Sequence, residues 1–387
     1  SLMTTASLSL IGLPYILKFL WAPIIDRFSP FGDDRRRSWI LIFQLLMVFL
    51  LFLMAYVGLK YSFDFIYDFS LFGHVFYIHF GFKWVLVLAF LLAFASASQD
   101  VVIDAYRVDY LSQHERPIGA SITTFSYRLA LLFSLSVLTL LVGSIGWNGA
   151  YYVAAFMMLL CFMHSLFLLR PIPVVSAPAT MRDAIFKPLN EFLARSESVK
   201  VIVFILLYRI SDNMATNMNM LFLKSYLHFS NFNIGAFSQP STIAGIIVGT
   251  LIAGLFIPKL GLYRALLIFG CLQALSNVGY VIMAVIGKSI PLMVSCFFLE
   301  HLFSGMATIA FVAFLMGLCD SRFSATQYAL FSAMMSLPKV ILGPIAGEFQ
   351  AHFGWVNFYL LSIALGFPSV LLLLNMKNKH FVSSMTV

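Results

Sequence analysis

The chain has 387 residues, of which 61% are hydrophobic and 10% are charged, and its formal net charge is +8. A soluble domain contains about 25% charged residues, so 24 Lys and Arg with 16 Asp and Glu are too few to cover a soluble protein of this length. The composition therefore excludes a soluble globular protein and predicts that most of the surface faces lipid.

Apolar runs long enough to cross a bilayer as helices recur along the chain, and the gaps between them are short. A spanning helix needs about 20 mostly apolar residues, and a helix satisfies its own backbone hydrogen bonds in lipid. We therefore expect an all-α polytopic membrane protein with eleven spans, at residues 2–28, 38–59, 83–110, 118–142, 148–169, 199–224, 235–257, 264–287, 290–318, 326–350 and 354–375.

The basic residues between these runs fall into two unequal sets that occupy alternate loops. The smaller set holds four: Lys60, Lys83, Lys224 and Lys288. The larger set holds sixteen: Arg27, Arg35, Arg36, Arg37, Arg107, Arg116, Arg170, Arg182, Lys187, Arg195, Lys200, Lys259, Arg264, Arg322, Lys377 and Lys379. Cytoplasmic loops carry the excess of Lys and Arg, so the loops of the larger set and the carboxy terminus are predicted to be cytoplasmic.

The first run, residues 2–28, precedes a loop that is predicted to be cytoplasmic, so this run would begin on the outer side of the membrane. The runs therefore indicate a twelve-helix protein whose first helix is absent from this chain. An authentic eleven-helix chain is the alternative.

The longest cytoplasmic stretch, residues 170–198, divides the chain into two parts. It contains an amphipathic segment with Ile185 and Leu189 on its apolar face, which predicts a helix lying in the membrane plane. Each part has a short basic turn after its second helix, at Asp26-Arg27 and before Arg264. These features predict the major facilitator fold of two six-helix bundles: an amino-terminal bundle at 1–169 that lacks helix 1, a linker at 170–198 and a carboxy-terminal bundle at 199–387.

Ionisable side chains inside the apolar runs are candidates for function, because each costs at least ~2.5 kcal/mol at the middle of a spanning helix. They fall on helices that would line a cavity in this fold, whereas the helices expected at the periphery have none in their apolar interiors. The candidates for proton coupling are the carboxylates Asp100, Asp104, Asp212 and Glu300.

Asp100 and Asp104 lie one turn apart and share a helix face. Two neighbouring carboxylates in a low dielectric resist double ionisation, so one of them is a candidate to bind a proton. Arg107 can neutralise Asp104, and an ion pair between helices that never titrates is the alternative. Glu300 is a second protonation candidate, and its neighbour His301 is expected to point elsewhere on the helix as a packed histidine.

Arg128 and Lys339 occupy equivalent helices of the two halves, which suggests an anionic substrate held between them. Charge balance for a buried carboxylate is the alternative role. Arg209 and Asp212 lie on adjoining faces of one helix and are expected to pair. The amides that follow them, Asn213 among them, should face water or a polar ligand, or else bond between helices.

The chain has no arrangement of residues typical of catalysis, and its four cysteines form no CxxC pair. It also lacks a basic face with interleaved aromatic residues. We therefore expect no enzyme, no metal, no cofactor and no nucleic-acid partner. A monomeric carrier driven by an ion gradient fits better.

Several motifs resemble those of the AmpG-type muropeptide permeases. In the first half they are Lys18-Phe19-Leu20-Trp21-Ala22-Pro23, Arg35-Arg36-Arg37-Ser38-Trp39, Ser96-Ala97-Ser98-Gln99-Asp100 and Tyr127-Arg128. In the second half they are Arg264-Ala265-Leu266-Leu267-Ile268-Phe269-Gly270, Phe323-Ser324-Ala325-Thr326-Gln327-Tyr328-Ala329-Leu330 and Gly343-Pro344-Ile345-Ala346-Gly347. The resemblance extends from about residue 5 to residue 375.

The resemblance implies a secondary active transporter of the bacterial inner (cytoplasmic) membrane that works by alternating access. It would import anhydro-muropeptides and N-acetylglucosaminyl-1,6-anhydro-N-acetylmuramic acid from periplasm to cytoplasm by proton symport, for peptidoglycan recycling. For the carboxylates of such a substrate the candidates are Arg128, Arg209 and Lys339, with Lys18 as a further binding candidate. For its hydroxyl and acetamido groups they are Gln99, Asn213, Asn217 and Gln327. The cytoplasmic motif expected to act in gating comprises Asp26, Arg27, Arg35, Arg36, Arg37 and Arg107.

Two alternatives remain open from the sequence. The acetyl-CoA transporters share the pattern around Lys18 and Gln99-Asp100, although the segment from Ser324 to Leu330 favours the muropeptide permeases. A membrane receptor that binds a ligand without moving it is the other alternative, but residues 170–198 are too few for an output domain.

Overall fold

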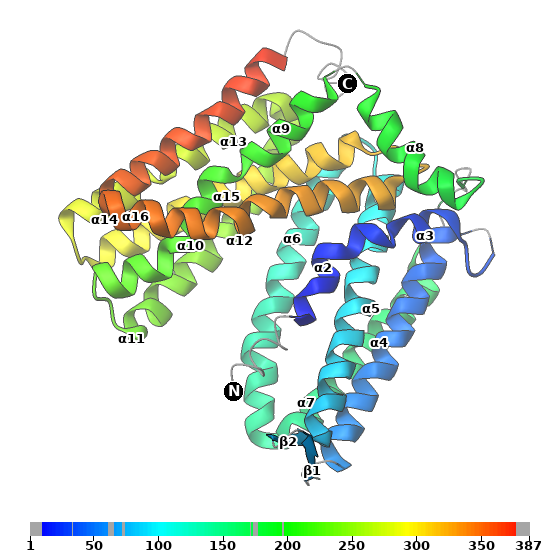
Figure 1. The fold of residues 1–387 in the computed structure, drawn as a ribbon. Helices are drawn as coiled ribbons and strands as arrows, with labels where there is room; N and C mark the ends of the chain where they lie inside the picture. Colours follow the sequence, from blue (N-terminus) through cyan, green and yellow to red (C-terminus); the bar gives the residue numbers. More distant parts are fainter. Residues whose placement is uncertain are drawn as a thin grey trace. The chain divides into compact units, whose positions relative to one another are not determined.

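Helices make up nearly all of the computed structural model, which describes residues 10–32, 34–60, 66–71, 74–170, 172, 177–195 and 197–376 (Figure 1). In chain order the elements are η1 (Leu10–Gly12), α2 (Leu13–Leu17), η2 (Lys18–Leu20), α3 (Ala22–Arg27), α4 (Arg35–Lys60), β1 (Ile66–Leu71), β2 (His74–His79), α5 (Phe80–Tyr110), α6 (Arg116–Phe133), η3 (Ser134–Leu138), α7 (Thr139–Leu168), α8 (Met181–Leu193), α9 (Ser198–Tyr208), α10 (Ile210–Leu221), η4 (Phe222–Tyr226), α11 (Asn231–Asn233), η5 (Ile234–Ser238), α12 (Gln239–Leu260), α13 (Leu262–Ser276), α14 (Val278–Ile286), α15 (Ile290–Leu318) and α16 (Ser324–Met376).

The chain divides into two compact units. Unit 1 comprises Ser1–Asp109, Ala130–Phe186 and Asp320–Ala329, and unit 2 comprises Tyr110–Leu129, Lys187–Cys319 and Leu330–Val387. The first turn of α16 thus belongs to unit 1, although the rest of that helix belongs to unit 2. The predicted division into two bundles at residues 170–198 remains a prediction.

The predicted apolar runs correspond to helices throughout the described part of the chain. Eight helices there are long and apolar enough to cross a membrane, and α16 contains two of the predicted runs. The runs at 2–28 and 199–224 are not among these eight, because each is broken into shorter helical pieces. Residues 1–9 of the first run lie outside the described residues.

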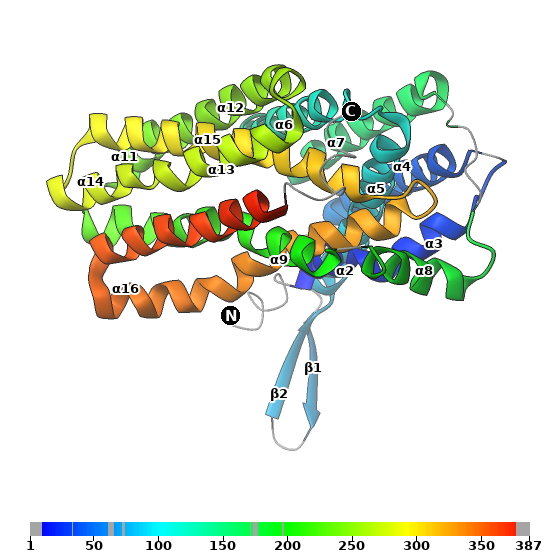
Figure 2. The ribbon, with the colours of Figure 1, turned by 90° about the horizontal axis from the view of Figure 1, so that it is seen from above.

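A short antiparallel hairpin joins α4 to α5, and the sequence analysis did not predict it. Strand β1 pairs with β2 from Ile66 opposite His79 to Leu71 opposite His74. Figure 2 shows the hairpin extending from the ends of the helices that it connects. The rest of the described structure is helical, as the predicted fold class requires.

Two Gly-Trp turns separate consecutive spans at equivalent places. Gly146 within α7 has φ 71° and ψ 175°, and Gly354 within α16 has φ 76° and ψ 172°. This backbone region is essentially restricted to glycine. Each glycine precedes a Trp whose ring contacts a Tyr four residues later, with centroids 6.5 Å apart for Trp147 and 6.0 Å apart for Trp355. The repeated turn supports the expectation that the sequence contains two related halves.

The cores of the two units are apolar and rich in aromatic residues. In unit 1, α4 packs on α5 and α7 through a cluster that includes Met47 and Leu88. In unit 2, a larger cluster surrounds Tyr280 and Tyr359, whose rings stack 4.8 Å apart. Helices α12 and α15 approach closely at Gly249, where a Cβ atom would lie 2.0 Å from the Leu302 carbonyl oxygen.

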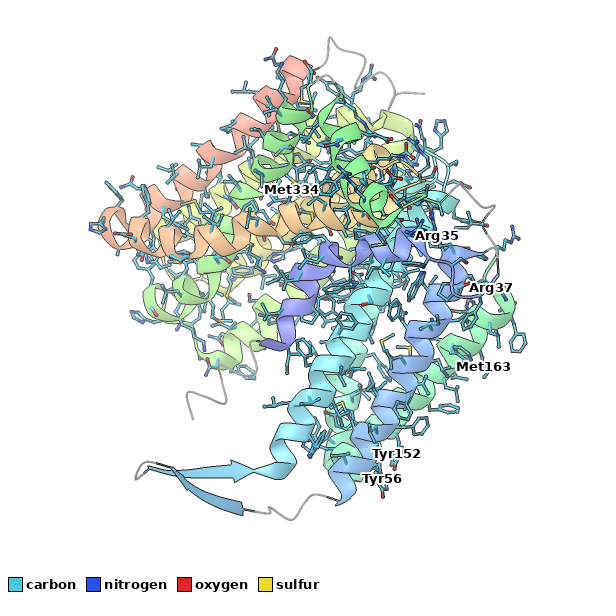
Figure 3. The ribbon with its side chains drawn as sticks, turned by 45° about the vertical axis from the view of Figure 1, so that its right-hand side comes forward. Arg35, Arg37, Tyr56, Tyr152, Met163 and Met334 are labelled. Atoms are coloured by element: carbon cyan, nitrogen blue, oxygen red, sulfur yellow. The ribbon has the colours of Figure 1, made fainter. Side chains whose placement is uncertain are left out.

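Basic and aromatic residues mark opposite ends of α4. Arg35 and Arg37 lie at its start, and Tyr56 lies near its other end, close to Tyr152 of α7 (Figure 3). Basic residues at cytoplasmic ends and aromatic residues at membrane–water interfaces are typical of spanning helices. This distribution agrees with the predicted cytoplasmic location of residues 29–37.

Candidate functional site

The first helical segment is broken at its middle, and the break positions Lys18 in unit 1. Between α2 and α3 the chain forms the 3-10 turn η2, with Pro14 before it and Pro23 after it. The Nζ atom of Lys18 lies 2.5 Å from Oδ2 of Asp100 and 3.7 Å from Oδ2 of Asp104, both on α5. The side chain of Lys18 is only 9% exposed. Discontinuous helices that present charges in this way are a feature of transporter sites.

Asp104 also forms an ion pair with Arg107, one turn further along α5. Two carboxylates therefore face two cations, and the cluster carries no excess charge. The shared helix face of Asp100 and Asp104 agrees with the sequence analysis, and both roles, proton binding and an ion pair that never titrates, remain predictions. Arg107 neutralises Asp104 as expected, and its part in the gating motif remains a prediction.

The gating motif forms a second buried network in unit 1, centred on Arg36. Its Nη2 atom lies 2.8 Å from Oδ1 of Asp26, and its Nε atom lies 2.8 Å from Oδ2 of Asp109. Nη2 also donates a hydrogen bond of 2.6 Å to Oγ of Ser324. The side chains of Arg36 and Asp26 are 2% and 0% exposed, so the pair is stabilised by mutual contact and not by water.

Asp26 also caps the first turn of α16. Its carboxylate accepts hydrogen bonds from the backbone N–H of Ala325 at 3.2 Å and of Thr326 at 2.7 Å, and from the Thr326 hydroxyl at 2.6 Å. A carboxylate at a helix amino terminus satisfies N–H groups that lack partners within the helix and interacts favourably with the helix dipole. Asp26 thus links α3, α4 and the start of α16.

The neighbouring basic residues bond to backbone oxygens. Arg27 contacts the Pro178 carbonyl, Arg35 contacts the carbonyl of Asp26, and Arg37 contacts the Leu166 carbonyl. The predicted gating residues other than Arg107 are therefore held around one end of unit 1. Trp39 belongs to the same region, since its Nε1 donates to the Phe28 carbonyl at 2.8 Å.

Unit 2 contains a second broken helix, and the break falls at Arg209. This residue separates α9 from α10 with φ −103° and ψ 5°. Its Nη2 atom donates to Oδ2 of Asp212 at 2.5 Å, and its Nη1 contacts the Thr308 hydroxyl. The predicted pairing of Arg209 with Asp212 is confirmed. Oδ1 of Asp212 accepts two further hydrogen bonds, from Ser304 at 3.0 Å and from Gln273 at 3.3 Å.

Glu300 lies on α15, one turn from Ser304, and is completely buried. Its Oε2 atom contacts Nδ1 of His301 and lies 3.5 Å from the Tyr280 hydroxyl, whereas Oε1 has no hydrogen-bond partner among the described residues. The expectation that His301 points away from Glu300 is wrong. The imidazole turns back along its own helix to the Phe297 carbonyl, 2.9 Å from Nδ1, and this orientation brings the ring to the carboxylate.

Buried amides extend the polar part of unit 2. Asn219 donates to the Tyr280 hydroxyl at 3.0 Å, and Asn277 donates to the hydroxyls of Ser211 at 3.1 Å and Ser362 at 3.0 Å. These bonds join α10, α13, α14 and α16 inside an apolar bundle. Asn219 thus bonds between helices, which the sequence analysis gave as the alternative to ligand contact for the amides after Asp212, and Asn277 bonds in the same way.

The other binding candidates are less tightly held. Arg128 is half-buried with its guanidinium 5.8 Å from the Tyr127 ring centroid, and the Lys339 side chain is exposed. Asn217 donates to the backbone carbonyl of Lys339 at 3.0 Å. Asn213 is buried on α10.

The two glutamine candidates lie in unit 1 and differ in their surroundings. Gln327 accepts a hydrogen bond of 2.7 Å from the backbone N–H of Asp320, which places it beside the gating network. Gln99 is half-buried on α5, and its Oε1 has no hydrogen-bond partner among the described residues.

Gln273, Asn277, Ser304 and Tyr280 were not named as site residues. All four are uncharged, and the sequence criterion selected charged residues inside apolar runs. Gln273 and Asn277 are spaced one turn apart within a predicted span. A buried amide also needs a hydrogen-bonding partner in lipid. The one-turn spacing of these two amides could therefore have indicated a buried polar site.

Comparison with known proteins decides the family. The sequence profile of the Major Facilitator Superfamily matches residues 1–341. The anhydromuropeptide permease of Escherichia coli (strain K12) is 36% identical over 374 residues, which cover 96% of this chain and 72% of that protein. The chain belongs to the AmpG-type muropeptide permease family of the Major Facilitator Superfamily. The putative transporter AmpG 1 of Rickettsia bellii (strain RML369-C) is 28% identical over 395 residues, covering 98% of this chain and 91% of that protein.

Solved structures of the superfamily share the fold. The proton:xylose symporter XylE bound to 6-bromo-6-deoxy-D-glucose gives a TM-score of 0.65 at 12% identity, covering 95% of this chain and 85% of that one. FucP in the outward conformation gives a TM-score of 0.66 at 11% identity, covering 96% and 90%. The predicted major facilitator fold is confirmed, and the chain is a multi-pass membrane transporter.

Proposed function

We propose that this transporter carries anhydro-muropeptides, including N-acetylglucosaminyl-1,6-anhydro-N-acetylmuramic acid, across the bacterial inner membrane by proton symport. The direction would be from periplasm to cytoplasm, for peptidoglycan recycling, with the carboxy terminus in the cytoplasm. The observation that supports the substrate best is the 36% identity to the anhydromuropeptide permease of Escherichia coli over 96% of the chain. Buried ionised groups on spanning helices fit a coupled carrier of a polar anion.

Two basic groups of unit 2 are the proposed contacts for substrate carboxylates. Arg128 offers a planar fork of N–H donors that matches a carboxylate, and Lys339 supplies a compact positive charge. Neither forms an ion pair with a carboxylate in the part of the chain that the structure describes, whereas Arg209 is already engaged with Asp212. The free Oε1 of Gln99 is the proposed acceptor for an acetamido N–H.

The network around Asp26 and Arg36 is the proposed cytoplasmic gate. It ties α3, α4 and α5 to the first turn of α16 through a buried ion pair and a helix cap. Opening would separate the Asp26–Arg36 ion pair and expose both charges to water. Their hydration would offset part of the ion-pair energy that is lost. Such a gate can therefore open and close at modest cost.

Uptake by the purified protein in proteoliposomes tests the proposal. Labelled anhydro-disaccharide should enter saturably, and entry should rise when the lumen is more alkaline than the outside. Arg128→Ala should raise KM about tenfold or more, because a charged hydrogen bond contributes about 1.5–3 kcal/mol. Arg264→Ala, which alters an exposed residue at the start of α13, is the matched control and should leave KM unchanged.

Competitors separate the alternatives in the same assay. Unlabelled muropeptide should compete with the disaccharide, and acetyl-CoA should not. Inhibition by acetyl-CoA alone would favour the acetyl-CoA type of carrier. Saturable binding of disaccharide without entry would indicate a receptor, and entry that ignores the pH gradient would contradict proton symport.

A further inference from the structure

Glu300 differs from the other buried carboxylates of the described helices in lacking a Lys or Arg partner. Asp26 and Asp109 pair with Arg36, Asp104 pairs with Arg107 and Lys18, and Asp212 pairs with Arg209. Glu300 is 0% exposed, yet its ionic partner in the described residues is the imidazole of His301. A buried carboxylate in this position is stable only if it binds a proton itself or if the imidazole binds one and becomes a cation beside it.

The hydrogen bonds of His301 define where that proton can go. Nδ1 lies 2.9 Å from the Phe297 carbonyl oxygen, which can only accept, so Nδ1 must carry a hydrogen. The same N–H group also contacts Oε2 of Glu300. Two positions then remain for one further proton, namely a Glu300 oxygen and Nε2 of His301. The pair therefore changes from one negative charge to none when a single proton binds.

The groups around the pair do not supply a compensating cation. The titratable side chains around the pair are Tyr280 of α14, Tyr359 of α16, Cys296 of α15 and Asp212 of α10, whose charge Arg209 balances. Asn219 of α10 contributes a neutral amide through the Tyr280 hydroxyl. None of these groups is positively charged apart from a protonated His301, so the protonation state of the pair sets the local charge.

The pair is also joined to the broken helix of unit 2. Ser304, one turn from Glu300 on the same helix, donates to Asp212 at 3.0 Å, and Asp212 holds Arg209 at the break between α9 and α10. Removing a negative charge from Glu300 in a low dielectric changes the electrostatic energy of this neighbouring ion pair. Proton binding and the geometry of the break are therefore coupled.

We propose that the proton that drives transport binds the Glu300–His301 pair in unit 2, and that the Lys18, Asp100, Asp104 and Arg107 cluster remains an ion-paired structural element. This inference rests on the proposed proton symport and assigns its site. The clusters have different charge balance: two cations meet two carboxylates in unit 1, and no permanent cation meets Glu300 in unit 2.

Two transport modes distinguish a proton site from a binding or packing residue. Gradient-driven accumulation requires proton binding and release, whereas exchange of labelled for unlabelled disaccharide at equal pH requires only substrate movement. Glu300→Gln should lose at least about 90% of gradient-driven accumulation and retain most of the exchange. Glu348→Gln, which changes an exposed carboxylate on α16, is the matched control and should keep both activities.

A second variant tests the partner. His301→Phe removes the Nδ1 donor but keeps a ring that can stack on Phe297, whose centroid lies 5.9 Å from that of His301. Oε2 of Glu300 then loses its contact with Nδ1, so the pH of half-maximal uptake should shift. A purely structural histidine would lower the rate without moving this pH.

The outcomes separate the inference from the proposed function. Wild-type protein that accumulates no disaccharide, or does so without a pH gradient, contradicts the proposed function. Wild-type coupling that persists in Glu300→Gln overturns the inference alone. The inference also fails if folded Glu300→Gln, judged by an unchanged gel-filtration profile, loses exchange and accumulation together.

Discussion

At the scale of single residues, the described carboxylates inside spans differ in how their charge is balanced. Asp26 has the most complete set of partners, since it meets Arg36 and three donors from the first turn of α16. Asp212 has Arg209, Ser304 and Gln273. Charges with such partners stabilise one geometry of the surrounding side chains. Glu300 has an oxygen without a hydrogen-bond partner among the described residues, and its ionic partner is the imidazole of His301.

Removing the carboxylate of Asp26 tests the first of these roles. Asp26→Ala leaves the guanidinium of Arg36 buried beside only Asp109 and leaves the amino terminus of α16 without its cap. We expect the free energy of unfolding to fall by about 3–5 kcal/mol, as for other broken buried ion pairs. Thr326→Val removes a single donor from the same carboxylate and should cost about 1 kcal/mol. Thermal unfolding in detergent measures both, and equal stability of Asp26→Ala and wild type would contradict the network.

The sequence criterion of charge inside an apolar run found Lys18, Asp104, Arg209, Asp212 and Glu300, all of which the structure places in buried polar clusters. It could not give their pairings across helices, because contacts between distant segments depend on helix rotation and on the breaks at η2 and between α9 and α10. The criterion did not select the buried amides, because they carry no charge. They nevertheless require hydrogen-bonding partners in lipid as the charged groups do.

At the scale of elements, the two Gly-Trp turns impose the same backbone geometry at Gly146 and Gly354. No atom lies within 4 Å of an added Cβ at either glycine, so a side chain there would meet backbone strain but no clash. Gly354→Ala should therefore lower the free energy of unfolding by about 1–3 kcal/mol. Gly347→Ala, in the same helix and also with open space, should be neutral or stabilising by up to about 1 kcal/mol. Equal effects of the two variants on thermal stability would contradict this account.

Element boundaries were predictable where a polar turn interrupts an apolar run, as between α12 and α13 at Gly261. Breaks inside apolar runs were not predictable, because a proline at positions such as 14 and 23 is compatible with a kinked helix as well as with the end of a helix. The hairpin of β1 and β2 was missed for another reason: its strands lie between two spans in a stretch of mixed aromatic and polar residues, where hydropathy gives no helical period.

At the scale of the whole molecule, the scarcity of charge has two separate consequences. Basic residues outside the spans are numerous on one set of loops and specify orientation. Several of the few charges inside the spans, among them Lys18, Asp104, Asp212 and Glu300, lie in buried clusters of both units, where they cost enough to require partners. The fold was predicted from composition and from the recurrence of apolar runs along the chain. The membership of the chain in the Major Facilitator Superfamily agrees with that prediction.

The orientation inferred from loop charge is the last prediction. A cysteine in place of exposed Ser29, in the loop between α3 and α4, should be cytoplasmic, and one in place of exposed Asn231, at the start of α11, should be external. Each is introduced after the native Cys161, Cys271, Cys296 and Cys319 have been replaced, and the cysteine-free protein must retain uptake. In right-side-out vesicles a membrane-impermeant maleimide should label Asn231→Cys at once and Ser29→Cys only after permeabilisation. The reverse pattern would place the basic loops outside, against the charge rule from which the orientation was derived.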